Sequence, residues 1–323
     1  MSIEENHAYI GGYLDSLKTQ RKLSPHTLSG YGRDLAELLV FADTLGGNFA
    51  LPSITHFHIR RLASQLHAKG LNPRSIARKL SSWRGFFNWL SGQTALASNP
   101  VDGIKAPKRS KPLPKALAAD DAVRLVSKTH PGKNPDSASQ QCNRAMFELL
   151  YSSGLRVSEL VGLDARYSRE ADHVSAGWID FDASEVTVTG KGSKMRSIPV
   201  GQPALRAVKD WLAIRSTLLE RSSDNDRFAL FLTDRGKRMS PRVVQTRLKA
   251  HAQALGIPAD VHPHVLRHSF ASHVLQSSGD LRAVQEMLGH ASIAATQVYT
   301  SLDFQRLAQV YDAAHPRAKK RCE

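Results

Sequence analysis

Cysteine is scarce in this sequence, with only Cys142 and Cys322 among its 323 residues. Two thiols, one of them close to the C-terminal end, cannot build the disulfide framework of a small secreted domain or a cysteine-based zinc site. We therefore expect a protein that works in a reducing compartment. Its content of 41% hydrophobic and 23% charged residues is typical of a folded globular chain.

Long apolar runs are also missing. No segment approaches the roughly 20 apolar residues that span a bilayer. The start, MSIEENHAYI, lacks the basic and apolar regions of a signal peptide. These absences predict a cytoplasmic protein.

Acidic residues are in deficit, with 29 Asp and Glu against 44 Lys and Arg, which gives a formal net charge of +15. The isoelectric point is near 10.0. Such a balance points to a polyanionic partner, and the lack of membrane segments favours nucleic acid.

A basic, proline-rich segment, residues 105–115 (KAPKRSKPLPK), divides the chain. Proline removes backbone donors and like charges repel, so the segment favours neither helix nor strand. We predict an N-terminal domain over residues 1–104, a linker over 105–115 and a second domain over 116–323. The linker is either a solvated connector or a strap along a phosphate backbone.

The N-terminal domain is predicted to consist of short helices. Ser24-Pro25 and Asn72-Pro73 have the pattern of an N-cap followed by proline at the first helical position. The second helix carries an aromatic stripe, interpreted as core, and several basic residues. The basic residues predicted to contact DNA, here and in the linker, are Arg74, Arg78, Lys79, Arg84, Lys105, Lys108, Arg109 and Lys111.

The second domain is predicted to be mostly helical with a small antiparallel sheet. Residues 178–181, 185–189 and 196–200 alternate as strands and are separated by short polar turns. Lys191 lies at the tip of the second hairpin, between Gly190 and Gly192.

A histidine-rich run, PHVLRHSF, places His264 and Arg267 on one helix face, three residues apart. A metal site would need more ligands, but no carboxylate or cysteine lies between residues 261 and 276, and Arg267 would repel a cation. We therefore predict an anionic ligand and no metal.

Two further segments have suggestive spacing. Arg156 follows a glycine at a predicted helix start, where a guanidinium can bind phosphate, although a surface ion pair explains it equally well. Gly289 is predicted to end a helix and Ser292 to begin the next one, which leaves His290 at the corner and Tyr299 two turns along.

Six residues occur in a distinctive order: Arg156, Lys191, His264, Arg267, His290 and Tyr299. Together with the surrounding GLRVSEL, TGKGSK, HVLRHSFASH and LGHASIAATQVYT, they resemble the tyrosine recombinase (phage integrase) family over nearly the whole chain. The resemblance implies a mainly α fold, in which a helical SAM-like core-binding domain and an α-rich catalytic domain with a small antiparallel sheet form a C-shaped clamp on double-stranded DNA.

The resemblance also implies the chemistry. Tyr299 would attack a phosphodiester and form a 3′-phosphotyrosine, with no metal, nucleotide or other cofactor. Arg156 and Arg267 would stabilise the charge on the phosphate, and Lys191 would protonate the leaving 5′-oxygen. His264 would orient the phosphate and His290 would donate a hydrogen bond to it.

The closing stretch, from SSGDLRAVQEMLGH onwards, resembles the Xer branch of the family, which resolves chromosome dimers. That implies a XerD-like partner in a heterotetramer on a dif-like site, regulation by an FtsK-type translocase, and association with the nucleoid during action. An apolar stripe after the tyrosine predicts a C-terminal interaction helix that docks on a neighbouring protomer or packs on its own: Leu302, Phe304, Leu307, Val310 and Tyr311.

Alternatives share parts of this pattern. A phage or transposon integrase and a type IB topoisomerase use the same residues, and a non-catalytic architectural protein could keep the fold. Ser272, Ser292 and Ser301 depart from the usual family residues outside the six. Residues 129–141 and 165–177 form polar segments that are longer than the family pattern, and we expect both to be loops.

Overall fold

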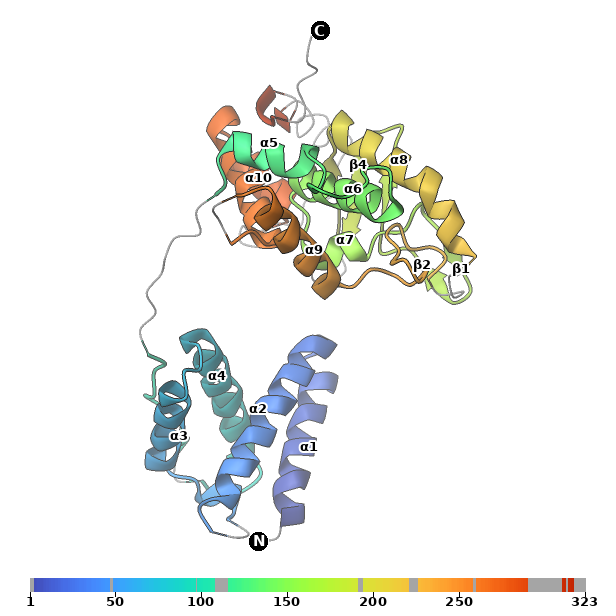
Figure 1. Ribbon diagram of the computed structural model, residues 1–323. Helices are drawn as coiled ribbons and strands as arrows, with labels where there is room; N and C mark the ends of the chain where they lie inside the picture. Colours follow the sequence, from blue (N-terminus) through green and yellow to red (C-terminus); the bar gives the residue numbers. More distant parts are fainter. Residues whose placement is uncertain are drawn as a thin grey trace. The chain divides into compact units, whose positions relative to one another are not determined.

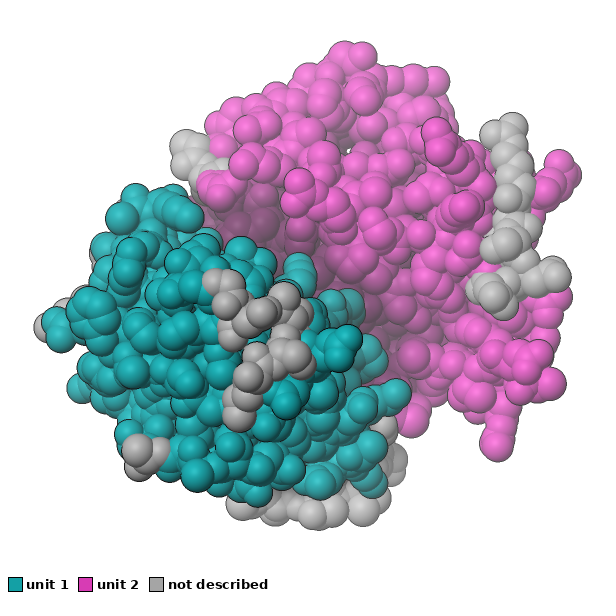
Figure 2. All heavy atoms as spheres, turned by 90° about the horizontal axis from the view of Figure 1, so that it is seen from below, with its two compact units in different colours: residues 1–112 teal, residues 113–323 magenta. Residues whose placement is uncertain are grey.

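The computed structural model describes residues 3–46, 49–96, 98–107, 116–190, 194–220, 226–257, 260–289, 310–311 and 313–316. The chain divides into two compact units, residues 1–112 and 113–323, coloured separately in Figure 2. Each unit has a hydrophobic core of its own.

The first unit is helical (Figure 1). Its elements are α1 (Ile3–Thr19), α2 (Pro25–Asp43), the 3-10 turn η1 (Leu51–Ser53), α3 (His56–Ala68) and α4 (Pro73–Leu90). The predicted helix starts are confirmed: Ser24 Oγ accepts from the Thr27 backbone N–H, and Asn72 Oδ1 accepts from that of Arg74. The aromatic residues Trp83, Phe86 and Phe87 of α4 are buried in this core, as predicted.

The second unit surrounds the buried helix α6. Its helices are α5 (Ala119–Ser127), α6 (Ala138–Ser153), α7 (Val157–Val161), α8 (Gln202–Leu219), α9 (Pro241–Ala254), α10 (Pro263–Ser278) and α11 (Leu281–Leu288). Twelve residues of α6 are buried. A helix that is buried over most of its surface must be covered by others, and α5, α8, α9 and α10 all pack against it.

The predicted three-stranded sheet is confirmed. Strands β3 (Gly177–Asp180), β4 (Glu185–Thr189) and β5 (Met195–Pro199) pair antiparallel in the order β3-β4-β5, with Val188 opposite Arg196. The prediction of a loop over residues 165–177 was wrong, because this segment contains a short hairpin, β1 (Arg169–Glu170) and β2 (His173–Val174). The other predicted loop is shorter than expected, since α6 begins at Ala138.

The described part of the C-terminal segment packs within its own unit. Tyr311 and His315 are buried, and the Tyr311 hydroxyl lies 2.6 Å from Ser152 Oγ on α6. The His315 ring stacks on Tyr311 and lies 5.3 Å from the Phe270 ring of α10. Tyr311 is therefore a core residue of this unit, in agreement with the predicted alternative that the stripe packs on its own protomer. Leu302, Phe304 and Leu307 lie outside the described residues.

Candidate active site

A tight turn between α6 and α7 places Arg156. Gly154 ends α6 in the left-handed conformation (φ +60°), which glycine adopts at little cost. A Cβ on Gly154 would lie only 2.4 Å from a ring carbon of Phe270. Arg156 then serves as the N-cap residue of α7, and its side chain is 41% exposed.

Arg267 reaches the same turn from α10. It is buried, with 6% of the residue exposed. Its Nη1 donates to the Gly154 carbonyl and its Nη2 to the Leu288 carbonyl, both at 2.7 Å. The fixed carbonyls hold the guanidinium between the α6–α7 turn and the end of α11.

The electrostatics of Arg267 suit an anion. Burial, together with the positive charges of Arg156 and Arg196, lowers the pKa of its guanidinium to about 10, and Glu159 opposes the shift. The lowered pKa indicates that nearby negative groups do not fully offset the positive charge of this buried guanidinium. A phosphate placed here would therefore be bound favourably.

Glu159 holds Arg156 in place. One carboxylate oxygen accepts from the Arg156 backbone N–H and the other from Arg156 Nη1, both at 2.8 Å. Burial alone would raise the pKa of this carboxyl, but the bonds and charge of Arg196 and the bonds from Arg156 hold it below its ordinary value. Glu159 is thus an anion in the folded protein.

Arg196 completes the cluster from β5. Its Nη1 and Nη2 donate to the two Glu159 oxygens at 3.0 and 2.8 Å, and its Nε donates to the Met287 carbonyl at 3.1 Å. Sequence reasoning missed Glu159 and Arg196. One signal was present: Arg196 has the same strand phase as the buried Ile198, so a charged side chain was directed inward.

The predicted site residues are only partly described. Arg156 and Arg267 are brought together, and His264 lies exposed in the first turn of α10, its ring 6.3 Å from that of His262. Lys191, His290 and Tyr299 lie outside the described residues.

Histidines of the run on α10 occupy different environments. His262 is the N-cap residue of the helix. His273 is buried, with its ring nitrogens 2.9 Å from the Tyr151 hydroxyl and the Leu117 carbonyl. Within the described ranges, no group of three His, Cys, Asp or Glu side chains could hold a metal ion.

Lys79 is not available for DNA, contrary to prediction. Its side chain is 9% exposed, and its Nζ pairs with Glu37 and with the fully buried Asp34, 3.3 Å away in the latter pair. Arg78 also pairs with Asp34, although it stays half exposed. These contacts join α4 to α2.

Arg84 also has a structural contact. It donates to the carbonyls of Val101 and Ile104 and so anchors the chain after α4. Arg74 and Lys105 are exposed and remain candidates for DNA contact. Lys108, Arg109 and Lys111 lie outside the described residues.

A basic surface around the start of α9 was not predicted. Arg235, Lys237 and Arg242 are exposed there. The neighbouring Arg238 ties this turn to α7, since it donates to the Val161 carbonyl at 3.0 Å and to Asp164 at 2.7 Å. The cluster DRGKRMSPR was a readable signal in the sequence.

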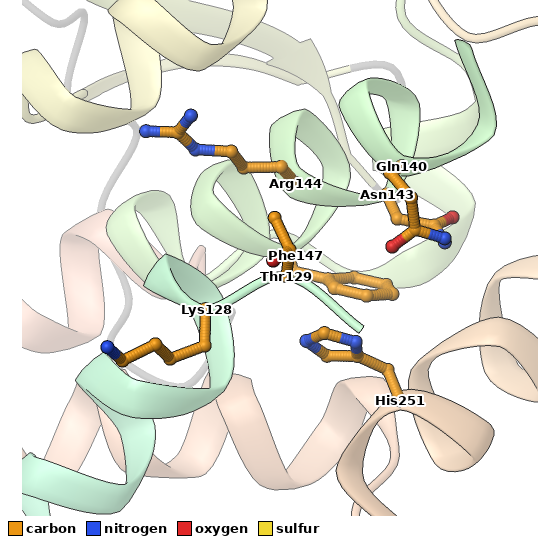
Figure 3. A pocket seen from close by; sticks show the side chains of 7 residues that line it. All are labelled: Lys128, Thr129, Gln140, Asn143, Arg144, Phe147 and His251. Atoms are coloured by element: carbon orange, nitrogen blue, oxygen red, sulfur yellow. The ribbon is translucent and has the colours of Figure 1, made fainter. Parts of the chain in front are cut away.

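A small pocket lies apart from the residues of the arginine site (Figure 3). Its cavity of about 10 Å³ has room for about one water. In Figure 3 the His251 ring lies beside Phe147, with centroids 5.3 Å apart, and the Gln140 and Asn143 amides lie together. Its size excludes it as a substrate site.

Comparison with known proteins identifies the family. Residues 115–306 match the phage integrase family, and residues 10–93 match the phage integrase N-terminal SAM-like domain. The chain belongs to the phage integrase family, that is, to the tyrosine recombinases, which break and rejoin DNA at specific sites. None of the helices in the described part combines the length and apolar character needed to cross a membrane.

The curated relatives point to one type of recombinase. The chain is 56% identical over 317 residues to tyrosine recombinase XerC 1 of Ralstonia nicotianae, covering 98% of this chain and 95% of the relative. It is 43% identical over 315 residues to tyrosine recombinase XerC of Pseudomonas aeruginosa, covering 97% and 96%. The chain is therefore a XerC-like tyrosine recombinase.

Solved structures share its fold. XerH recombinase bound to a palindromic difH substrate in a post-cleavage complex has a TM-score of 0.65 at 20% identity, covering 92% of this chain and 82% of that one. A lambda integrase dimer bound to a COC′ core site has a TM-score of 0.61 at 18% identity, covering 93% and 99%.

Proposed function

We propose that Arg156 and Arg267 bind the scissile phosphate of a dif-like DNA site and that Tyr299 attacks it. The observation that carries the proposal is a cluster of three guanidinium groups and one carboxylate at the junction of α6, α7, β5, α10 and α11. Arg156 and Arg196 donate to Glu159, and Arg267 donates to the Gly154 carbonyl. Two net positive charges remain there for an anionic ligand. Glu159 accepts from one terminal nitrogen of Arg156. The Arg156 guanidinium is half exposed, and its other N–H groups can donate to phosphate.

The Tyr299 oxygen would bond to phosphorus as the bond to the 5′-oxygen breaks, which leaves a 3′-phosphotyrosine and a free 5′-hydroxyl. Lys191 would give its proton to the leaving oxygen, and His264 would help to accept the tyrosine proton. The arginines stabilise negative charge that grows in the transition state. His290 would add a hydrogen bond to the phosphate. This route uses no metal, nucleotide or other cofactor.

The partners follow from the type of recombinase. A 5′-hydroxyl from a second duplex can attack the phosphotyrosine and produce exchanged strands. We assign this chain to two positions of a heterotetramer whose other two positions belong to a XerD-like recombinase. Its task would be to resolve chromosome dimers in the cytoplasm, on the nucleoid, under the control of an FtsK-type translocase.

DNA contact would involve both units. Arg74 and Lys105 of the first unit and the basic surface of Arg235, Lys237 and Arg242 in the second are exposed cations. The ion pairs between Arg238 and Asp164 and between α2 and α4 stabilise the scaffold that carries them.

The test of this function uses a nicked dif-like duplex, from which the short cleaved strand diffuses away and so traps the intermediate. Wild type and Tyr299→Phe are incubated with it, with a XerD-like partner and with EDTA, and the products are separated on a denaturing gel. A covalent protein–DNA band in the wild type alone is expected. A band in both proteins would place the nucleophile elsewhere. DNA binding without a band in either would favour an architectural protein.

A further inference from the structure

Arg196 joins three segments that lie far apart in the sequence. From β5 it donates to both oxygens of Glu159 on α7 and to the carbonyl of Met287 at the end of α11. Each of its three guanidinium nitrogens therefore has an acceptor within the protein. The residue is only 6% exposed, so it is poorly placed to serve as a phosphate ligand itself.

Its main partner is shared with Arg156. Glu159 Oε1 accepts from Nη1 of both arginines, at 2.8 Å from Arg156 and 3.0 Å from Arg196. Oε2 accepts from the Arg156 backbone N–H and from Arg196 Nη2, both at 2.8 Å. Without Arg196, this buried carboxylate would have Arg156 as its main counter-charge and would neutralise it. With Arg196 present, Arg156 keeps both its orientation and its net charge.

The second contact acts on the end of α11. Arg196 bonds the Met287 carbonyl and Arg267 bonds the next one, that of Leu288. Gly289 follows with φ +64°, and a Cβ there would lie 3.1 Å from Nε of Arg196. The Arg196 side chain thus packs against the turn at the end of α11, which also binds Arg267.

We propose that Arg196 is a positioning residue that sets Arg156 through Glu159 and Arg267 through the end of α11, without touching DNA. This inference rests on the proposed function, in which Arg156 and Arg267 neutralise the scissile phosphate. At metal sites, residues that orient the ligating side chains typically contribute about 10- to 100-fold to affinity or activity, and we expect an effect of the same order for Arg196. Loss of Arg196 should therefore slow cleavage and leave DNA affinity nearly unchanged.

The test compares Arg196→Gln with Arg156→Gln, the double variant and Arg215→Gln. Arg215 is a matched control, because it is also 6% exposed in the same unit, and its bonds to described residues go to the carbonyls of Arg227 and Ala229, after α8. Single-turnover cleavage of the nicked duplex is measured with a normal scissile phosphate and with an uncharged methylphosphonate there. Binding of the intact duplex and thermal stability are measured in parallel.

On the normal phosphate, Arg196→Gln should cleave about 10- to 100-fold more slowly than wild type. The double variant should be slower than Arg156→Gln alone, but by less than the full deficit of Arg196→Gln, because the effect that passes through Arg156 is already lost and only the effect on Arg267 remains. On the methylphosphonate, which carries no charge to neutralise, the deficit of Arg196→Gln should nearly vanish. Arg215→Gln should show no such dependence on the substrate.

Three results would overturn the inference: equal deficits on both substrates, effects of the two single variants that multiply in the double variant, or the same pattern in Arg215→Gln. Normal cleavage by Arg196→Gln beside an active wild type would reject this inference alone. A wild type that forms no covalent product would reject the proposed function, and this inference with it.

Discussion

At the residue scale, two basic residues of α4 differ in their exposure to solvent. Lys79 is buried against Asp34 and Glu37, whereas Arg74 is exposed at the start of the helix. Lys79→Met should lower the free energy of unfolding by about 1–3 kcal/mol, because it leaves a buried carboxylate poorly compensated. Arg74→Met should leave that free energy nearly unchanged and reduce the salt dependence of DNA binding. Urea unfolding and binding titrations check both, and weaker DNA binding by a stable Lys79→Met protein would contradict the assignment.

A second residue-scale prediction concerns pH. Burial lowers the pKa of His315 to about 3, so the folded state keeps it neutral while the unfolded chain protonates it below pH about 6.5. Below that pH the unfolded state binds more protons, and stability must fall as the pH falls. Between pH 7 and 5 this histidine should cost about 2 kcal/mol of stability. Urea unfolding of His315→Phe should show a shallower pH dependence than the wild type, and identical slopes would refute the prediction.

At the scale of elements, the sequence was sufficient to predict those structures that depend on residues close together in the chain. The caps at Ser24 and Asn72, and the strand alternation on either side of Gly190, are set by neighbouring residues, and all of these elements form. The pairing of Arg196 with Glu159 spans 37 residues and that with Met287 spans 91, so no local pattern could reveal it. The same reason hid the pairing of Lys79 with Asp34, 45 residues away.

The turn between α6 and α7 gives an element-scale prediction. Gly154 needs a left-handed conformation and also abuts Phe270, whereas Gly256 has a similar φ of +65° and a Cβ added there would meet no atom within 4 Å. Gly256→Ala should cost about 1–2 kcal/mol from backbone strain alone. Gly154→Ala should cost a further 1–3 kcal/mol, roughly, from overpacking, and should slow cleavage because its carbonyl anchors Arg267. Equal losses of stability in urea would show that the contact with Phe270 is unimportant.

At the scale of the whole molecule, the net charge of +15 should appear as a steep salt dependence of DNA binding. Each phosphate contact adds about 0.9 to the slope of log K against log salt. The double variant Arg235→Gln/Arg242→Gln should therefore lower that slope by nearly two units, if both residues contact phosphates as proposed.

Arg227→Gln is the matched control, because Arg227 is exposed but pairs with Glu170 at 2.6 Å and lies over the Phe228 ring. An exposed cation that already has a carboxylate partner releases no counterion from DNA, so its removal should leave the slope unchanged. A similar fall in both variants would mean that total charge, and not the surface at the start of α9, governs binding.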